Sequence, residues 1–134
     1  MLKTKAALKA VRESCGLSQQ DVADEVGVRI LSVKRWENPK QPQEAPEDVW
    51  SFLLHARGAM FEDARNLADQ MIKSYKGSGE VIIDYYRTQE ELDAVQLDAG
   101  IDEPVEYYNA RARLIGQFLE QAEVPYTFVY PEVD

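Results

Sequence analysis

The chain has 134 residues, 45% of them hydrophobic, which suits one domain or two small lobes and argues against wholesale disorder. Its net charge of −9 divides into +1 for residues 1–60 (nine Lys/Arg, eight Asp/Glu) and −10 for residues 61–134 (six and sixteen), so a polyanionic partner is favoured only at the N-terminal end. The sequence lacks a run of about 18 apolar residues and an apolar N-terminal leader, so we expect a cytoplasmic protein that makes no membrane contact.

Three short helices are predicted in the first 38 residues, over residues 2–14, 19–26 and 30–38. Apolar side chains recur in steps of three and four through these ranges, as the buried face of a helix requires. Ser18 is a suitable N-cap for the second helix, with the acidic Asp21 three positions later, and Gly27 is suited to the turn that ends it.

A proline-rich connector over residues 39–46 precedes an apolar stripe from Val49 to Tyr75, which predicts one long helix or two helices divided at Gly58. The second half of the chain is predicted to begin with a strand, because β-branched and aromatic residues follow one another there. In chain order we expect a strand at 81–86, a helix at 88–97 opened by a capping box from Thr88 to Glu91, a loop at 98–103, a helix at 104–122 and a strand at 126–130. The fold class is therefore mainly α with a small β element (α+β).

The segment from Leu8 to Asn38 carries a recognisable motif. It contains LSQQDVADEVGV at residues 17–28 and VKRWEN at residues 33–38. With the small Ala23 at a helix crossing and Gly27 in the turn, residues 5–58 resemble the Xre/Cro/lambda-repressor helix-turn-helix family. The resemblance implies an N-terminal DNA-binding domain at residues 1–58, followed by a second lobe at 59–134, in a transcriptional regulator that acts as a repressor or autorepressor.

In this family the third helix lies in the major groove of double-stranded DNA, with its N-terminal residues facing base edges. The resemblance implies a phosphate contact for Gln19, and Arg29 is placed to make another. Arg35 is the best candidate for reading guanine, because a guanidinium bonds O6 and N7 together, and Lys34 suits either a base or a phosphate. The full set of DNA-binding candidates is Gln19, Arg29, Ile30, Leu31, Lys34 and Arg35.

Two of these candidates depart from the family pattern. Ile30 and Leu31 stand where polar residues are usual. Branched apolar side chains can contact thymine methyl groups, and they can equally cover a protein surface. The resemblance also implies a structural ion pair between Arg12 of the first helix and Glu37 of the third.

One recognition helix touches only a few base pairs, so we expect a homodimer on a palindromic operator. Two strands alone make a marginal sheet, and pairing of a strand edge across a two-fold axis would extend it. The candidate interface is residues 81–86 and 126–130, beside the helix at 105–122. The order of elements also resembles, in layout only, anti-CRISPR-associated and related phage autorepressors, and no residue role follows from that likeness.

A second hypothesis is an antitoxin-like or adaptor protein whose acidic C-terminal lobe binds a protein partner. We expect no enzyme, since the sequence shows no nucleophile and base pair, phosphate loop or metal-ligand set, and we expect no cofactor. Cys15 and His55 are predicted to be packing or surface residues without a chemical role.

Overall fold

The computed structural model describes residues 1–132, and among them it contains six α-helices, one 3-10 helix and two strands. The chain forms two compact units, called here unit 1 (residues 1–59) and unit 2 (residues 60–134). The predicted fold class, mainly α with a small β element, is confirmed. In chain order the elements are α1 (Lys5–Ser14), α2 (Gln19–Val26), α3 (Ile30–Glu37), α4 (Glu47–Ser74), β1 (Val81–Asp84), α5 (Gln89–Gln96), the 3-10 helix η1 (Leu97–Ala99), α6 (Val105–Gln121) and β2 (Tyr126–Val129).

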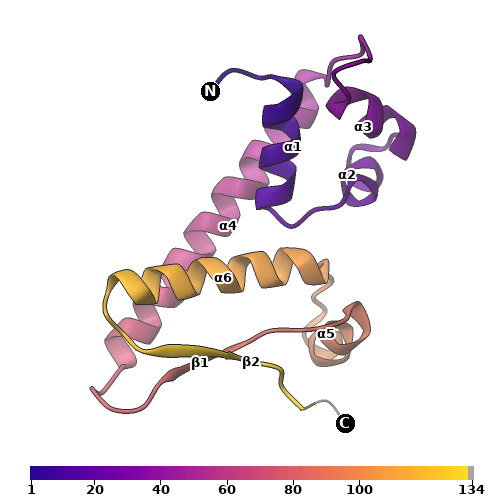
Figure 1. The fold of residues 1–134 in the computed structure, drawn as a ribbon. Helices are drawn as coiled ribbons and strands as arrows, with labels where there is room; N and C mark the ends of the chain where they lie inside the picture. The colour runs from indigo at the N-terminus through magenta and orange to yellow at the C-terminus, as the bar shows by residue number, and fades with distance from the viewer. Residues whose placement is uncertain (133–134) are drawn as a thin grey trace. The chain divides into compact units, whose positions relative to one another are not determined.

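Unit 1 contains α1, α2, α3 and the beginning of α4 (Figure 1). α1 begins later than predicted, at Lys5, because the hydroxyl of Thr4 accepts a hydrogen bond from the backbone N–H of Ala7 at 3.0 Å and caps the helix. Leu2 therefore lies outside the helix and is 84% exposed. The core of unit 1 is apolar and consists of Leu8, Val11, Cys15, Leu17, Val22, Ala23, Val33, Trp36, Val49, Trp50 and Leu53.

α4 is a single helix of 28 residues, which decides between the two alternatives that the sequence left open. It continues through Gly58, where a glycine costs only about 1 kcal/mol relative to alanine, and the buried apolar stripe outweighs that cost. Glu47 and Asp48 lie in its first turn, where a negative charge interacts favourably with the helix dipole. No helix of the described residues is both long enough and apolar enough to cross a membrane.

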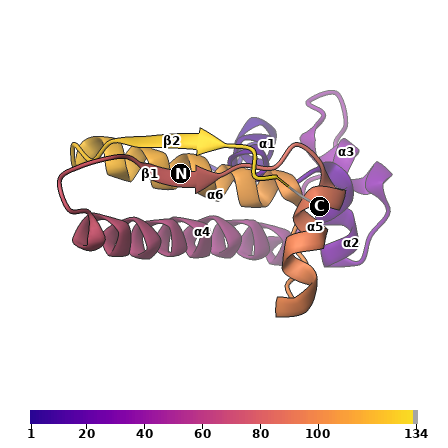
Figure 2. The same cartoon turned by 90° about the horizontal axis from the view of Figure 1, so that it is seen from below.

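The two strands of unit 2 pair in parallel, with Val81 opposite Tyr126 and Asp84 opposite Val129. A tight turn cannot join parallel neighbours, and here the connection runs through α5, η1 and α6. α6 lies against one face of the sheet (Figure 2). Gly116 permits this close approach, because a Cβ at that position would stand 2.9 Å from Cζ of Phe128.

The core of unit 2 is built from the second half of α4, α6 and the sheet, and small residues let the helices approach. Its buried cluster consists of Ala64, Ala68, Ile83, Ala112, Ile115, Leu119 and Val124. One polar side chain, Asn109 of α6, is buried beside it. Its Nδ2 donates to the carbonyl of Tyr86 at 2.8 Å, and its Oδ1 accepts from the N–H of Tyr86 at 3.1 Å. Asn109 thereby bonds the backbone just beyond the end of β1.

The predicted capping box of α5 forms only in part. The hydroxyl of Thr88 accepts from the N–H of Glu91 at 3.2 Å, as predicted. The carboxylate of Glu91, however, accepts from Nη2 of Arg87 at 2.6 Å, so it is paired with a cation four residues earlier. The loop predicted after α5 also begins with ordered backbone, because residues 97–99 form η1.

Candidate nucleic-acid interface

The turn between α2 and α3 is shaped by local signals in the sequence. Ser18 and Asp21 form a complete capping box, in which the serine Oγ accepts from the Asp21 N–H at 2.9 Å and the aspartate accepts from the Ser18 N–H at 2.8 Å. Gly27 ends α2 with a φ of 74°, a backbone region that a residue with a Cβ adopts at a cost. These two features fix where α2 begins and where the chain turns toward α3.

Packing between α2 and α3 determines which face of α3 points outward. Val33 and Trp36 of α3 are buried, as are Val22 and Ala23 of α2. Ala23 has no exposed surface, which agrees with a small residue being needed where two helices approach closely. The opposite face of α3 is thereby left to solvent.

The structure brings Arg12 and Glu37 together in a bidentate ion pair. Nε of Arg12 lies 2.6 Å from Oε2 of Glu37, and Nη2 lies 2.9 Å from Oε1. The side chains are only 11% and 5% exposed, and Nη1 of Arg12 also donates to the carbonyl of Leu17 at 2.9 Å. The hydrogen bond to Glu37 raises the pKa of Arg12. Removing one partner of so buried a pair costs about 3–5 kcal/mol, so the pair is part of the scaffold that orients α3.

Gln19, the predicted phosphate ligand, lies at the start of α2 and is half-buried. Its Nε2 donates to Oε1 of Glu37 at 3.2 Å, so it touches the same carboxylate as Arg12. An amide nitrogen carries two hydrogens. One bond to Glu37 therefore orients the Gln19 side chain and leaves its second N–H able to donate elsewhere.

The outward face of α3 carries Leu31, Lys34 and Arg35, which are all exposed. At 3.6 residues per turn, Leu31 and Arg35 lie one turn apart on the same ridge. Ile30 lies in the same first turn but is half-buried. The structure thus separates the two apolar candidates, because Leu31 is 47% exposed and faces outward whereas Ile30 is partly covered by unit 1.

Three cations at α3 are free of ion pairs in the described part of the chain. These are Arg29, Lys34 and Arg35, and all three side chains are exposed. Arg29 is the N-cap residue of α3, and its side chain makes no capping bond to the helix. The α3 surface therefore combines positive charge with one exposed apolar side chain, a composition suited to the backbone and base edges of DNA.

Lys5 is a structural residue of this unit that the sequence did not reveal. Its Nζ donates to the carbonyls of Arg35 and Trp36, at 3.1 and 3.2 Å, and to the carbonyl of Gln43. Carbonyls at the C-terminal end of a helix have no partner within the helix, and a cation stabilises them. Since Lys5 is 30 positions from Arg35, no local pattern could have indicated the contact.

The reactive side chains Cys15 and His55 of unit 1 do not form a catalytic or metal-binding arrangement. Cys15 is fully buried, and burial raises the pKa of its thiol, which disfavours the reactive thiolate. His55 is exposed on α4. Across residues 1–132, no group of three or more His, Cys, Asp and Glu side chains is arranged to hold a metal ion.

Residues 8–42 match a family model described as helix-turn-helix, whereas the comparison with curated proteins found no match to this chain. The matched residues include most of α1 and all of α2 and α3, which hold the capping box, the Gly27 turn and the buried ion pair. The resemblance predicted from the sequence is thereby confirmed for this segment. Residues 8–42 are accordingly a helix-turn-helix of the Xre and lambda-repressor type, a kind found in DNA-binding transcription regulators.

Proposed function

We propose that the chain is a repressor that binds a palindromic operator as a homodimer. The observation that carries the proposal is the outward face of α3, where Leu31, Lys34 and Arg35 are exposed and neither cation is paired with a carboxylate in the described residues. A second helix in a helix-turn-helix enters the major groove with such a face toward the bases.

Each side chain of this face has a distinct proposed role. Arg35 reads guanine through two hydrogen bonds, and Leu31, on the same ridge, contacts a thymine methyl group. Lys34 and Arg29 contact phosphates at either side of the groove. Gln19, oriented by Glu37, donates its remaining amide N–H to a further phosphate. Ile30 is half-buried and makes the smaller contribution of the two apolar residues.

The role of Arg35 is tested after selection of bound duplexes from a random pool. Arg35→Ala is expected to lose most discrimination between the selected and a random duplex, whereas Gln19→Ala weakens binding to both. Arg57→Ala removes an exposed cation of α4 and serves as the charge-matched control, with discrimination unchanged. Equal loss of affinity for both duplexes in Arg35→Ala would contradict base reading by this residue.

Leu31 is tested by removing the thymine methyl group from the DNA. Replacing operator thymines one at a time by deoxyuridine should cost about 1 kcal/mol at the contacted position, because one buried methyl is lost. In Leu31→Ser the same replacement should have no effect. A cost that is equal in the wild-type protein and in Leu31→Ser would show that another residue makes the methyl contact.

The proposed dimer uses residues 81–86 and 126–130 beside the helix at 105–122. Three features support it: the sheet has only two strands, each with one edge unpaired in the described residues, and Ile82 is 55% exposed on it. Sedimentation should show a dimer for the full chain and a monomer for Ile82→Lys, with weaker operator binding. Val95→Lys, at an exposed position of α5, is the matched control. A dimeric Ile82→Lys would count against this interface.

One observation favours a second candidate, an adaptor or antitoxin-like protein. A leucine that is 47% exposed on the outward face of α3 would also suit a protein surface. Capture of a stoichiometric protein partner, together with no retention of any duplex at low salt, would decide for this alternative. Retention of a selected duplex that is lost in Arg35→Ala would decide for the repressor.

A further inference from the structure

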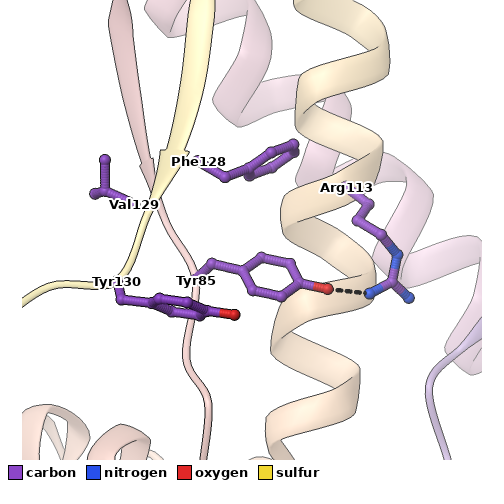
Figure 3. Close-up of a pocket in the computed structure, with 5 residues that line it drawn as sticks. All are labelled: Tyr85, Arg113, Phe128, Val129 and Tyr130. Carbon is purple, nitrogen blue, oxygen red and sulfur yellow. Dashed lines mark hydrogen bonds between the residues drawn. The ribbon is translucent and has the colours of Figure 1, made fainter.

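A cavity of about 350 Å³ lies in unit 2 beside the ends of the two strands. Tyr85 and Tyr130 follow β1 and β2, Phe128 belongs to β2, and Arg113 projects from α6 (Figure 3). The remaining lining residue, Val129, turns its side chain away from the others. The volume falls in the range of about 300–1,000 Å³ that is usual for small-molecule sites.

Three aromatic rings line this cavity. The ring of Tyr85 lies 5.6 Å from that of Phe128 at an angle of 66°, and 6.4 Å from that of Tyr130 at 55°. Phe128 and Tyr130 remain 41% and 61% exposed, so much of their surface has no partner in the described residues. Rings held in this way offer faces and edges on which a flat aromatic group can pack.

The position of Phe128 depends on α6. Gly116 leaves room for the rings of Phe128 and Tyr126, which would lie 2.9 and 3.0 Å from a Cβ at that site. Phe128 lies opposite the buried Ile83 in the parallel sheet, so β1 holds the backbone of Phe128 while α6 contacts its ring. The aromatic wall is thus a built part of the fold, although its rings are exposed.

Arg113 supplies the charge of the cavity. Its Nη1 donates to the hydroxyl of Tyr85 at 2.6 Å, which directs the guanidinium toward the rings (Figure 3). Two other arginines of unit 2, Arg87 and Arg111, are paired with Glu91 and Glu103, whereas Arg113 has no carboxylate within ion-pair distance in the described residues. In the half of the chain whose net charge is −10, an arginine left without a carboxylate beside aromatic rings is suited to an external anion.

We propose that this cavity binds a planar aromatic carboxylate. The ring system packs against the exposed surfaces of Phe128 and Tyr130, which flank the ring of Tyr85, and the carboxylate accepts hydrogen bonds from the guanidinium of Arg113. The inference does not rest on operator binding by α3, so either of these two proposals can fail without the other. The lining residues do fall within the ranges proposed for the dimer, so a dimer through those ranges would cover the cavity.

The proposal is tested by calorimetric titration of the full chain with 2-naphthoate and with its neutral amide. Naphthoate should bind saturably and about tenfold more tightly than the amide, because only the anion gains a charged hydrogen bond to Arg113. Arg113→Gln should reduce naphthoate affinity to that of the amide. Arg65→Gln is the matched control, since Arg65 lies over the ring of Phe118 at 5.7 Å but outside the cavity, and it should bind like the wild type.

Two further ligands and variants separate the parts of the site. Cyclohexanecarboxylate carries the charge without the aromatic ring and should bind at least several-fold more weakly than naphthoate. Phe128→Leu should weaken the binding of naphthoate and reduce the difference in affinity between naphthoate and cyclohexanecarboxylate. Circular dichroism checks that the variant is folded. The proposal is overturned if naphthoate gives no saturable binding up to about 10 mM, if Arg113→Gln binds it as tightly as the wild type, or if cyclohexanecarboxylate binds equally well.

Discussion

The ammonium group of Lys5 adds to the C-terminal capping of α3, where the N–H of Asn38 already donates to the carbonyl of Arg35 at 3.2 Å. Its bonds to the carbonyls of Arg35, Trp36 and Gln43 hold together the end of α3 and the connector that follows. Arg12, which also belongs to α1, pairs with Glu37, the last residue of the same helix. Two cations of α1 therefore hold the C-terminal end of α3, and we expect their loss to act on the proposed DNA binding by destabilising unit 1.

Lys5→Met should lower the free energy of unfolding by about 1–2 kcal/mol, since the helix-terminal carbonyls lose a charged donor while the apolar stem is kept. Urea denaturation followed by tryptophan fluorescence measures the change, because Trp36 and Trp50 both lie in unit 1. Lys9→Met, at an exposed position of the same helix, should change stability by less than about 0.5 kcal/mol. Equal effects of the two substitutions would contradict a capping role for Lys5.

At the scale of elements, Asn109 acts as a short extension of the sheet. Its side-chain amide offers one donor and one acceptor to Tyr86, which is the pattern that a neighbouring strand would offer. β1 ends at Asp84, and the N–H of Tyr85 still donates to the carbonyl of Val129, whereas the N–H and carbonyl of Tyr86 are satisfied by α6. This arrangement couples the helix to the strand through polar bonds as well as through the apolar core.

Asn109→Leu should destabilise unit 2 by about 2–4 kcal/mol, because it leaves a buried N–H and a buried carbonyl of Tyr86 without partners. Near-ultraviolet circular dichroism during urea unfolding follows the tyrosines, all seven of which lie at or after residue 75. Asn66→Leu, at an exposed position of α4, provides the comparison and should leave the transition almost unchanged. A loss in Asn109→Leu no larger than that in Asn66→Leu would show that the two bonds contribute little.

At the scale of the whole molecule, charge and aromatic residues are divided between the units. The first 60 residues carry +1 and the remainder −10, so an anionic duplex is attracted only toward unit 1. Within unit 2, Glu103 accepts hydrogen bonds from Arg111 at 2.6 and 3.0 Å and from Gln96 at 2.9 Å. Burial alone would raise the pKa of Glu103, but these hydrogen bonds and the charge of Arg111 lower it below 4.5.

This shift predicts the acid sensitivity of unit 2. Because the pKa of Glu103 is lower in the folded chain than in the unfolded chain, its contribution to stability is complete above about pH 4.5 and is lost as the pH falls through the lowered value. Glu103→Gln should be less stable at pH 7 and should show a flatter decline in acid. Glu106→Gln, at an exposed position of α6, should keep the wild-type pH dependence. Thermal unfolding followed by the tyrosine signal from pH 7 to 3 makes the comparison; identical slopes for Glu103→Gln and the wild type would contradict it.

Local signals predicted the elements well, because caps and apolar periodicity act over a few residues. Ser18, Asp21 and Gly27 predicted where α2 begins and ends. The resemblance carried by the motif implied the ion pair between Arg12 and Glu37. The remaining features depend on residues that are distant in sequence: Lys5 reaches α3, Asn109 reaches the end of β1, and Arg113 meets Tyr85 from 28 positions away. The packing of α6 determines that the strands pair in parallel and where the cavity opens. No short stretch of sequence indicates either feature.

The parallel pairing of β1 and β2 imposes an order on the folding of unit 2. Val81 and its partner Tyr126 are 45 positions apart, so β1 has no strand to join until α5, η1 and α6 have been made and have turned the chain back. Contacts of such separation close slowly, because the entropy of the loop is lost before the sheet stabilises it. During synthesis the segment Val81–Asp84 therefore stays unpaired until Tyr126–Val129 has been made, whereas the helices of unit 1 can already form from local contacts.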